Sequence, residues 1–146
     1  MTGFSAKINT SALQKDLKAL TKDTDAATKK GLRAVAARVR TEGRKGAPVY
    51  SGPRTTVSVG KGKQIPLVPG ELRKSIAASK RFESLGNGEY RLTVGPRGGH
   101  VHLYMLKEER RAGFMAHARE TIAGGEAKRI HEAAWARAIN KSRGVK

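Results

Sequence analysis

The first twenty residues carry two patterns of apolar positions with different periods. Between residues 4 and 8 every second side chain is apolar, which predicts a short, half-buried strand. Ser11 then begins a capping-box pattern, and Leu13, Leu17 and Leu20 fall on one helical face. This spacing predicts a short amphipathic helix whose leucines pack inward.

A second, longer helix is predicted to begin after a cap at Thr24 or Asp25 and to stop at Gly43, Gly46 and Pro48. Small residues in its inward-facing stripe permit close approach of another helix, from this chain or from a neighbouring subunit. The stripe consists of Thr28, Leu32, Val35, Ala36 and Val39.

Residues 47–69 form a long connection rich in glycine, proline and basic residues, which we call the basic arm. Its two X-Pro steps favour extended backbone, and its glycines weaken any regular element. Structureless loops beyond about 12 to 15 residues are uncommon in a compact domain unless they are functional or disordered. We therefore interpret the basic arm as a segment that takes a fixed shape on neighbouring copies or other partners. The residues expected to make those contacts are Val49, Tyr50, Arg54, Val57, Val59, Lys61, Lys63, Ile65 and Leu67.

Two elements are predicted directly after the basic arm. A short helix over residues 71–76 has Leu72 and Ile76 on one face. Strands over residues 80–83 and 90–95, joined through a Gly-Asn-Gly turn, form a hairpin.

The last part of the chain is predicted to be mainly helical. Residues 101–106 are apolar enough for a strand or the start of a helix, and periodicity does not separate the two over so short a run. A final helix is predicted over residues 126–140, with Gly124 and Gly125 breaking it from a helical turn around residues 119–122.

Length and composition indicate one domain, residues 1–146, with a modest core. Hydrophobic residues make up 38% of the chain and aromatic residues only 5%, so self-association would add stability. No apolar run reaches the roughly 20 residues that span a bilayer, and residues 1–11 lack the apolar stretch of a secretory signal. We expect a soluble protein that starts in the cytoplasm and has no membrane partner. Cysteine is absent, which excludes disulfides and thiolate chemistry.

The charge balance predicts an acidic partner. Lysine and arginine total 30 against 12 aspartate and glutamate residues, a formal charge of +18. Between residues 29 and 63 there are ten basic residues and one acidic residue. A non-specific nucleic-acid-binding protein is therefore one hypothesis, since phosphate contacts need no base-reading motif. The residues expected to face DNA or an acidic neighbour are Lys29, Lys30, Arg33, Arg38, Arg40, Arg44 and Lys45.

Catalytic chemistry finds little support in the sequence. His100 and His102 would share one side of a strand and could bind a metal if Glu108 came near, although an ordinary surface role is the stronger interpretation. The run GKGK at residues 60–63 lacks the serine or threonine and the upstream glycine of a phosphate-binding loop. We expect no enzyme activity, no cofactor and no metal.

Four landmarks, in order, resemble the neck or head-to-tail connector proteins of long-tailed bacteriophages, a family of tail-completion and tail-component proteins. They are the Ala-rich helix ending in GAPV at residues 46–49, the run PGELRKSI at residues 69–76, VHLY at residues 101–104 with the following Glu108, and FMAHA at residues 114–118. The chain departs from the family where EERR at residues 108–111 replaces Glu-Phe-Gly, and where Gly113 and His117 replace two prolines.

The resemblance implies an α+β subunit in which a small antiparallel sheet is packed by an N-terminal helix pair and a C-terminal helix, with the basic arm extended. It also implies a structural virion protein that forms a homo-oligomeric ring at the head-tail junction around the DNA channel. The implied partners are other copies of the chain, the connector or head-closure proteins, the tail-terminator proteins and, non-specifically, packaged DNA. The implied location is the virion neck, and the host cytoplasm during assembly.

Overall fold

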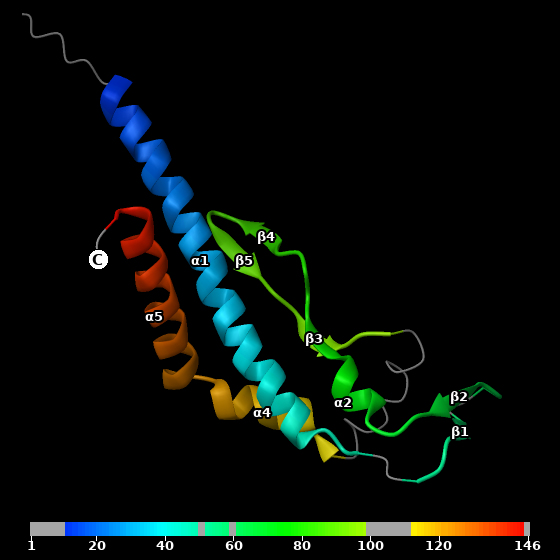
Figure 1. Cartoon of the computed structure of the whole chain (residues 1–146). Coiled ribbons are helices and arrows are strands. Elements are labelled where there is room, and N and C mark those ends of the chain that lie inside the picture. Colours follow the sequence, from blue (N-terminus) through cyan, green and yellow to red (C-terminus); the bar gives the residue numbers. More distant parts are fainter. Residues whose placement is uncertain (1–10, 50–51, 59–60, 99–111, 145–146) are drawn as a thin grey trace, which may run out of the picture.

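One long helix dominates the computed structural model, which describes residues 11–49, 52–58, 61–98 and 112–144 (Figure 1). Helix α1, Ser11–Gly46, has 36 residues and is therefore a rod of about 54 Å. The helix boundary predicted at Thr24 or Asp25 is wrong, because α1 runs through both residues. The Thr24 hydroxyl donates to the carbonyl of Leu20, at 3.0 Å, so the side chain expected to cap a new helix is satisfied within the existing one.

Short strands and helices follow α1. Within the described residues the strands form three antiparallel pairs, β1 with β2, β3 with β6 and β4 with β5. The predicted α+β class is confirmed, although the small sheet is divided into these separate ladders. In chain order the elements are β1 (Thr55–Ser58), β2 (Gln64–Leu67), α2 (Glu71–Ser75), β3 (Ile76–Ala78), β4 (Glu83–Gly86), β5 (Glu89–Arg91), β6 (Val94–Pro96), α4 (Phe114–Ile122) and α5 (Gly125–Ser142).

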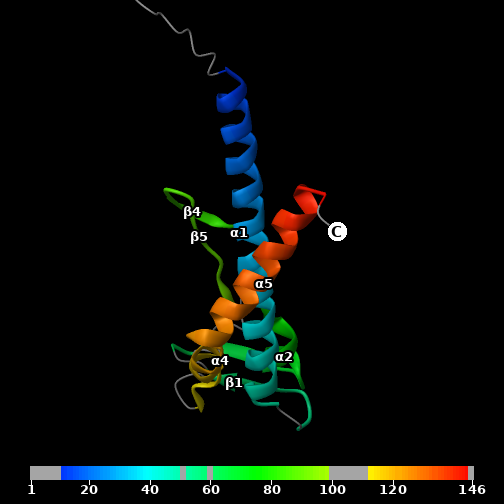
Figure 2. The ribbon, with the colours of Figure 1, turned by 90° about the vertical axis from the view of Figure 1, so that its left-hand side faces the viewer.

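Helix α5 packs on the middle of α1, and the β4–β5 hairpin lies against another side of α1 (Figures 1 and 2). The approach is close at Gly31, where an added Cβ would lie 2.6 Å from Cδ2 of His131 on α5. Ala27, one turn earlier, is only 1% exposed. The close helix contact predicted from the small residues Thr28 and Ala36 is present, but it occurs at Gly31, near the buried Ala27, while Ala36 lines a groove.

A small apolar core lies where the C-terminal end of α1 meets the short elements. Ala47, Leu72, Ile76 and Phe114 are each at most 4% exposed and pack together, with Met115 against them. The core therefore joins the end of α1 to α2, β3 and α4 across almost seventy residues of sequence.

A short helix and a hairpin are present between residues 71 and 98, as predicted, but the first hairpin strand is Glu83–Gly86 and not residues 80–83. Leu72 and Ile76 are both buried, as predicted, but α2 ends at Ser75 and Ile76 begins β3, so the two residues do not share a helical face. Asn87 and Gly88 have φ angles of 49° and 77°, as a tight two-residue hairpin turn between β4 and β5 requires. The predicted second strand is divided, however, because β5 ends at Arg91 and β6 then pairs with β3.

The C-terminal helices are also close to the prediction. Helix α5 covers the predicted residues 126–140, and Gly124, with φ 73°, separates it from α4. The single turn expected before that break is in fact a nine-residue helix that begins at Phe114. The elements predicted over residues 4–8 and 101–106 lie outside the described residues.

Two glycines of α1 allow the packing of α5 and α4 to be tested with one type of substitution. Gly31→Ala is expected to lower the free energy of unfolding by about 1–2 kcal/mol, because overpacking against the His131 ring outweighs the higher helix propensity of alanine. Gly43→Ala should cost less, since its Cβ would meet the flexible end of Met115 at 2.7 Å from the sulfur. Urea denaturation of both variants provides the comparison, and a Gly31→Ala protein as stable as the Gly43→Ala protein would contradict this packing.

Candidate assembly surface

The described part of the basic arm contains a β-hairpin, so the prediction of a structureless connection is wrong. β1 and β2 are antiparallel, with Thr56 opposite Pro66. Lys61 and Gly62, both with positive φ, lie in the turn between the strands. Proline is tolerated here because β2 is an edge strand, which leaves a backbone position without a ladder bond on its open side. Glycine at position 62 therefore helps to build the turn rather than preventing regular structure.

This hairpin is a poor candidate for an independently stable unit. Within the described residues, β1 and β2 pair only with each other, and Figure 1 shows the hairpin set apart from the α1–α5 pair. A two-stranded hairpin in water is marginally stable, and the outer edges of such a pair present unpaired backbone groups unless another segment covers them. A further strand or another surface would complete it.

The residues predicted to contact partners through the basic arm fall into three groups. Val49, Arg54, Lys61 and Lys63 are exposed, and Val49 retains 47% of its surface. Ile65 is 4% exposed and is therefore buried in the isolated chain, so its contact with a partner stays a prediction. The last group comprises Val57 and Leu67, which lie within β1 and β2, and Tyr50 and Val59, which lie outside the described residues.

Two of the basic residues of α1 hold the β4–β5 region against the helix. The Lys29 ammonium lies 4.5 Å from the centroid of the Tyr90 ring, and the Arg33 guanidinium lies 4.9 Å from that of Phe82. The two rings also meet edge to face. Cation–π contacts of this kind attach a hairpin that has few other anchors.

Arg44 holds the backbone of the next elements. Its Nε donates to the carbonyl of Ile76 at 3.0 Å, and Nη2 donates to the carbonyl of Lys74 at 3.3 Å. Arginine suits this role because its donors point in fixed directions. The end of α1 is thereby joined to α2 and β3.

A charged network joins α1 to the start of α5. Oε1 of Glu42 accepts hydrogen bonds from Arg38, at 2.7 Å, and from Lys45, at 2.9 Å. Arg38 also donates from Nε to Glu126 at 3.0 Å. The hydrogen bond from Lys45 holds the pKa of Glu42 below its usual value, while that with Glu126 raises the pKa of Arg38.

The residues predicted to face DNA or an acidic partner are thus mostly occupied within the molecule. Lys29, Arg33, Arg38, Arg44 and Lys45 all make the contacts just described. Lys30 is exposed, and Arg40 is half-buried beside Arg33 and Lys80. Glu42 is a local partner of Arg38 and Lys45, but Tyr90, Phe82 and Glu126 are distant in sequence, and no local pattern pointed to them.

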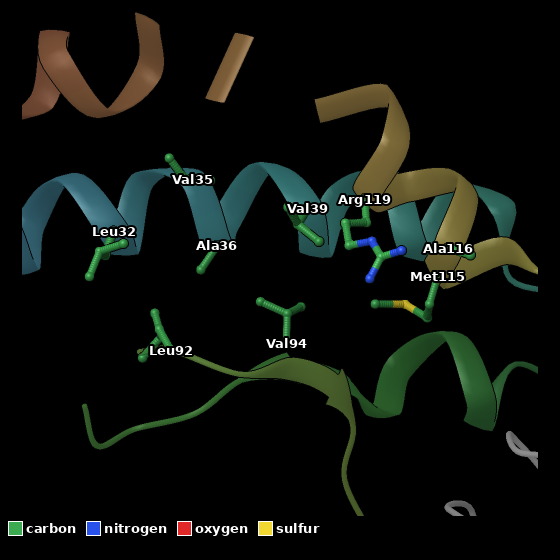
Figure 3. A pocket seen from close by; sticks show the side chains of 9 residues that line it. All are labelled: Leu32, Val35, Ala36, Val39, Leu92, Val94, Met115, Ala116 and Arg119. Carbon is green, nitrogen blue, oxygen red and sulfur yellow. The ribbon is translucent and has the colours of Figure 1, made fainter. Parts of the chain in front are cut away.

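An apolar groove of about 480 Å³ lies between α1, the segment around β6 and α4 (Figure 3). Leu32, Ala36 and Val39 point from α1 toward Leu92 and Val94 on the opposite wall. Met115, Ala116 and Arg119 of α4 close one end, and Arg119 is the only charged residue among the described residues of the lining. The periodicity of the sequence placed Leu32, Ala36 and Val39 on one face of a helix, but we expected that face to be buried core.

Neither a metal site nor a membrane span is found in the part of the chain that the structure describes. No group of three potential ligands among histidine and carboxylate residues comes together there. His100, His102 and Glu108, the candidate metal ligands, lie outside it. None of the helices searched combines the length and hydropathy that crossing a bilayer would require.

The described residues define a small α+β protein with three separate two-stranded ladders and an apolar groove at its surface. Residues 11–104 match the family model described as "Bacteriophage HK97-gp10, putative tail-component". The match covers more than half of the chain, so the protein belongs to this family, as its sequence motifs indicated. It is a phage tail-component structural protein, associated with the virion. No curated protein and no solved structure gives a significant match.

Acidification should weaken the Glu42 network. Since the folded state lowers the pKa of Glu42 from its ordinary value of 4.5, the network stabilises the fold above that pH and is lost as the pH falls through the lower, folded-state value. We expect the stability difference between the native chain and Glu42→Gln to be larger at pH 7 than at pH 3. Urea denaturation at both pH values measures it, with Lys45→Gln as a second variant that should show the same trend. A difference that grows on acidification would contradict the assignment.

Proposed function

We propose that this protein is a neck subunit of a long-tailed phage, forming a ring at the head-tail junction that helps join the tail to the capsid around the DNA channel. Membership of a tail-component family supports the structural role. The proposed partners are further copies of the chain, the connector or head-closure proteins on one side and the tail-terminator proteins on the other.

The observation that carries this proposal is the incomplete β1–β2 hairpin. Its two strands have partners only in each other among the described residues, while Arg54, Lys61 and Lys63 are exposed along it. Strand addition to an open edge satisfies backbone groups, and exposed side chains then select the partner. A neighbouring subunit or an adjoining ring would supply the added strand and the surface that the exposed side chains recognise.

Protection of the basic arm from trypsin is the first test. Cleavage after Arg54, Lys61 and Lys63 should be rapid in the free chain, since these residues are exposed on a marginal hairpin. We expect cleavage to slow by roughly tenfold or more when the chain is assembled, because a docked segment opens less often.

The same samples are examined by electron microscopy and mass measurement, with an equimolar unrelated protein as the control for trypsin inhibition. A chain that stays monomeric in the presence of its connector and terminator partners, and whose arm is cut at the same rate there, would overturn the proposal.

The charge of +18 favours a second candidate function, non-specific contact with DNA. Of the α1 residues predicted to face DNA, Lys30 and Arg40 are the two for which no ion pair, ring contact or side-chain hydrogen bond is found within the described residues, so they are the ones of that set best placed to contact phosphate. Such contact would suit a ring around a DNA channel, and would also suit a protein that binds nucleic acid alone.

Salt dependence separates these possibilities. If the isolated chain binds duplex DNA, the logarithm of its affinity should fall with the logarithm of salt concentration by about 0.9 per phosphate neutralised. Lys30→Ala and Arg40→Ala should each reduce this slope by about 1, whereas Lys74→Ala, an exposed lysine outside α1, should leave it unchanged. A weak affinity with a flat slope removes the nucleic-acid-binding candidate.

A further inference from the structure

The outer end of α1 carries apolar side chains that the molecule itself does not cover. Leu17 is 53% exposed and Leu20 is 41% exposed, although their spacing predicted that they pack inward. Both views show this end of α1 extending past α5 and past the β4–β5 hairpin (Figures 1 and 2). The two leucines therefore lie on one face of α1 as predicted, but no helix or strand within the described residues packs on that face.

The apolar groove presents the complementary shape elsewhere on the same molecule. Its α1 wall spans Leu32 to Val39, about two turns of helix, and Leu92 and Val94 form the facing wall. A helix that offers two leucines three residues apart matches a groove of this length, since helix recognition uses anchors at such spacings.

Charge decides which surface of a neighbouring molecule suits this groove. Two copies that each carry +18 repel each other unless they meet through surfaces of low charge. Residues 11–25 are such a surface, because three lysines there are matched by three aspartates, which are all the aspartates in the chain.

The position of these aspartates strengthens the match. Asp16 and Asp23 lie four residues before and three residues after Leu20, and so share its face of the helix. Arg119 is exposed at the end of the groove and is the one charged side chain that the described part of the chain contributes to its lining. An aspartate beside the inserted leucine would therefore meet a guanidinium of the neighbour.

We propose that the Leu17–Leu20 face of α1 in one copy inserts into the apolar groove of the next copy. Because the two surfaces lie at different places on one chain, the contact is head-to-tail, and repetition closes a ring when the rotation between copies allows it. The inference rests on the ring of the proposed function and names the surfaces that would hold it together.

Leu20→Glu tests the contact, with Leu85→Glu as its matched control. Leu85 is 48% exposed on β4, so both substitutions place a carboxylate at a similarly exposed leucine. Leu20→Glu should abolish the oligomer seen by light scattering, while Leu85→Glu should retain it. Both variants should melt at the same temperature as the native chain at a concentration where that chain is monomeric, since neither leucine is buried in the monomer. A folded Leu20→Glu protein that still assembles overturns the proposal.

Cysteine cross-linking provides the second measurement, which also reports a weak contact. The native chain has no cysteine, so a Leu20→Cys protein mixed with an Ala116→Cys protein of different mass offers one pair of thiols. Ala116 is exposed in the lining of the groove. The expected product is a disulfide between the two different chains. Leu20–Leu20 cross-links alone would indicate a symmetric contact between outer α1 ends and would overturn the proposal.

The remaining outcomes separate this contact from the ring itself. If the native chain is monomeric under all conditions but the mixed disulfide forms, the contact stands and the ring fails. If a ring forms without the mixed disulfide, only the contact fails. Slow reaction of Ala116→Cys with a maleimide in the Leu20→Glu monomer would show that the chain's own residues cover the groove, which also overturns the proposal.

Discussion

The close packing of α5 on α1 is the constraint on which the described structure depends. The two helix axes can approach because Gly31 leaves room for the His131 ring and Ala27 is almost fully buried beside it. Helix α5 follows α4 after a sharp break at Gly124, so its position also fixes Phe114 and Met115 against the end of α1. The small core at Ile76 and Leu72 is built on that arrangement.

Sequence patterns predicted the local features well and the distant contacts poorly. The burial of Leu72 and Ile76 and the glycine break at position 124 each depend on residues close together in sequence, and each is confirmed, although Ile76 begins a strand instead of ending the helix. The groove and the Gly31–His131 contact join residues far apart, which periodicity does not relate. Periodicity likewise placed Leu17 and Leu20 on one face without indicating whether another element covers that face.

Several of the basic side chains bind groups within the same chain. Aromatic rings hold Lys29 and Arg33, backbone carbonyls hold Arg44, and Glu42 binds both Arg38 and Lys45. A count of charges from the sequence therefore overstates how many cations are available to a partner. It remains a sound guide to the long-range field of the protein, because an arginine or lysine bound to a ring or a carbonyl keeps its charge.

The continuity of α1 has a mechanical consequence. An α-helix bends sharply where proline, a bulge or an inserted group interrupts its hydrogen bonds, and α1 contains no proline over its 36 residues. Its two ends therefore move together. A force that displaces the outer end must tilt the whole helix about its contact with α5. The inner end then moves as well, together with α2 and β3, because Arg44 donates hydrogen bonds to both. A displacement of one end of α1 is therefore transmitted to the other end of the subunit.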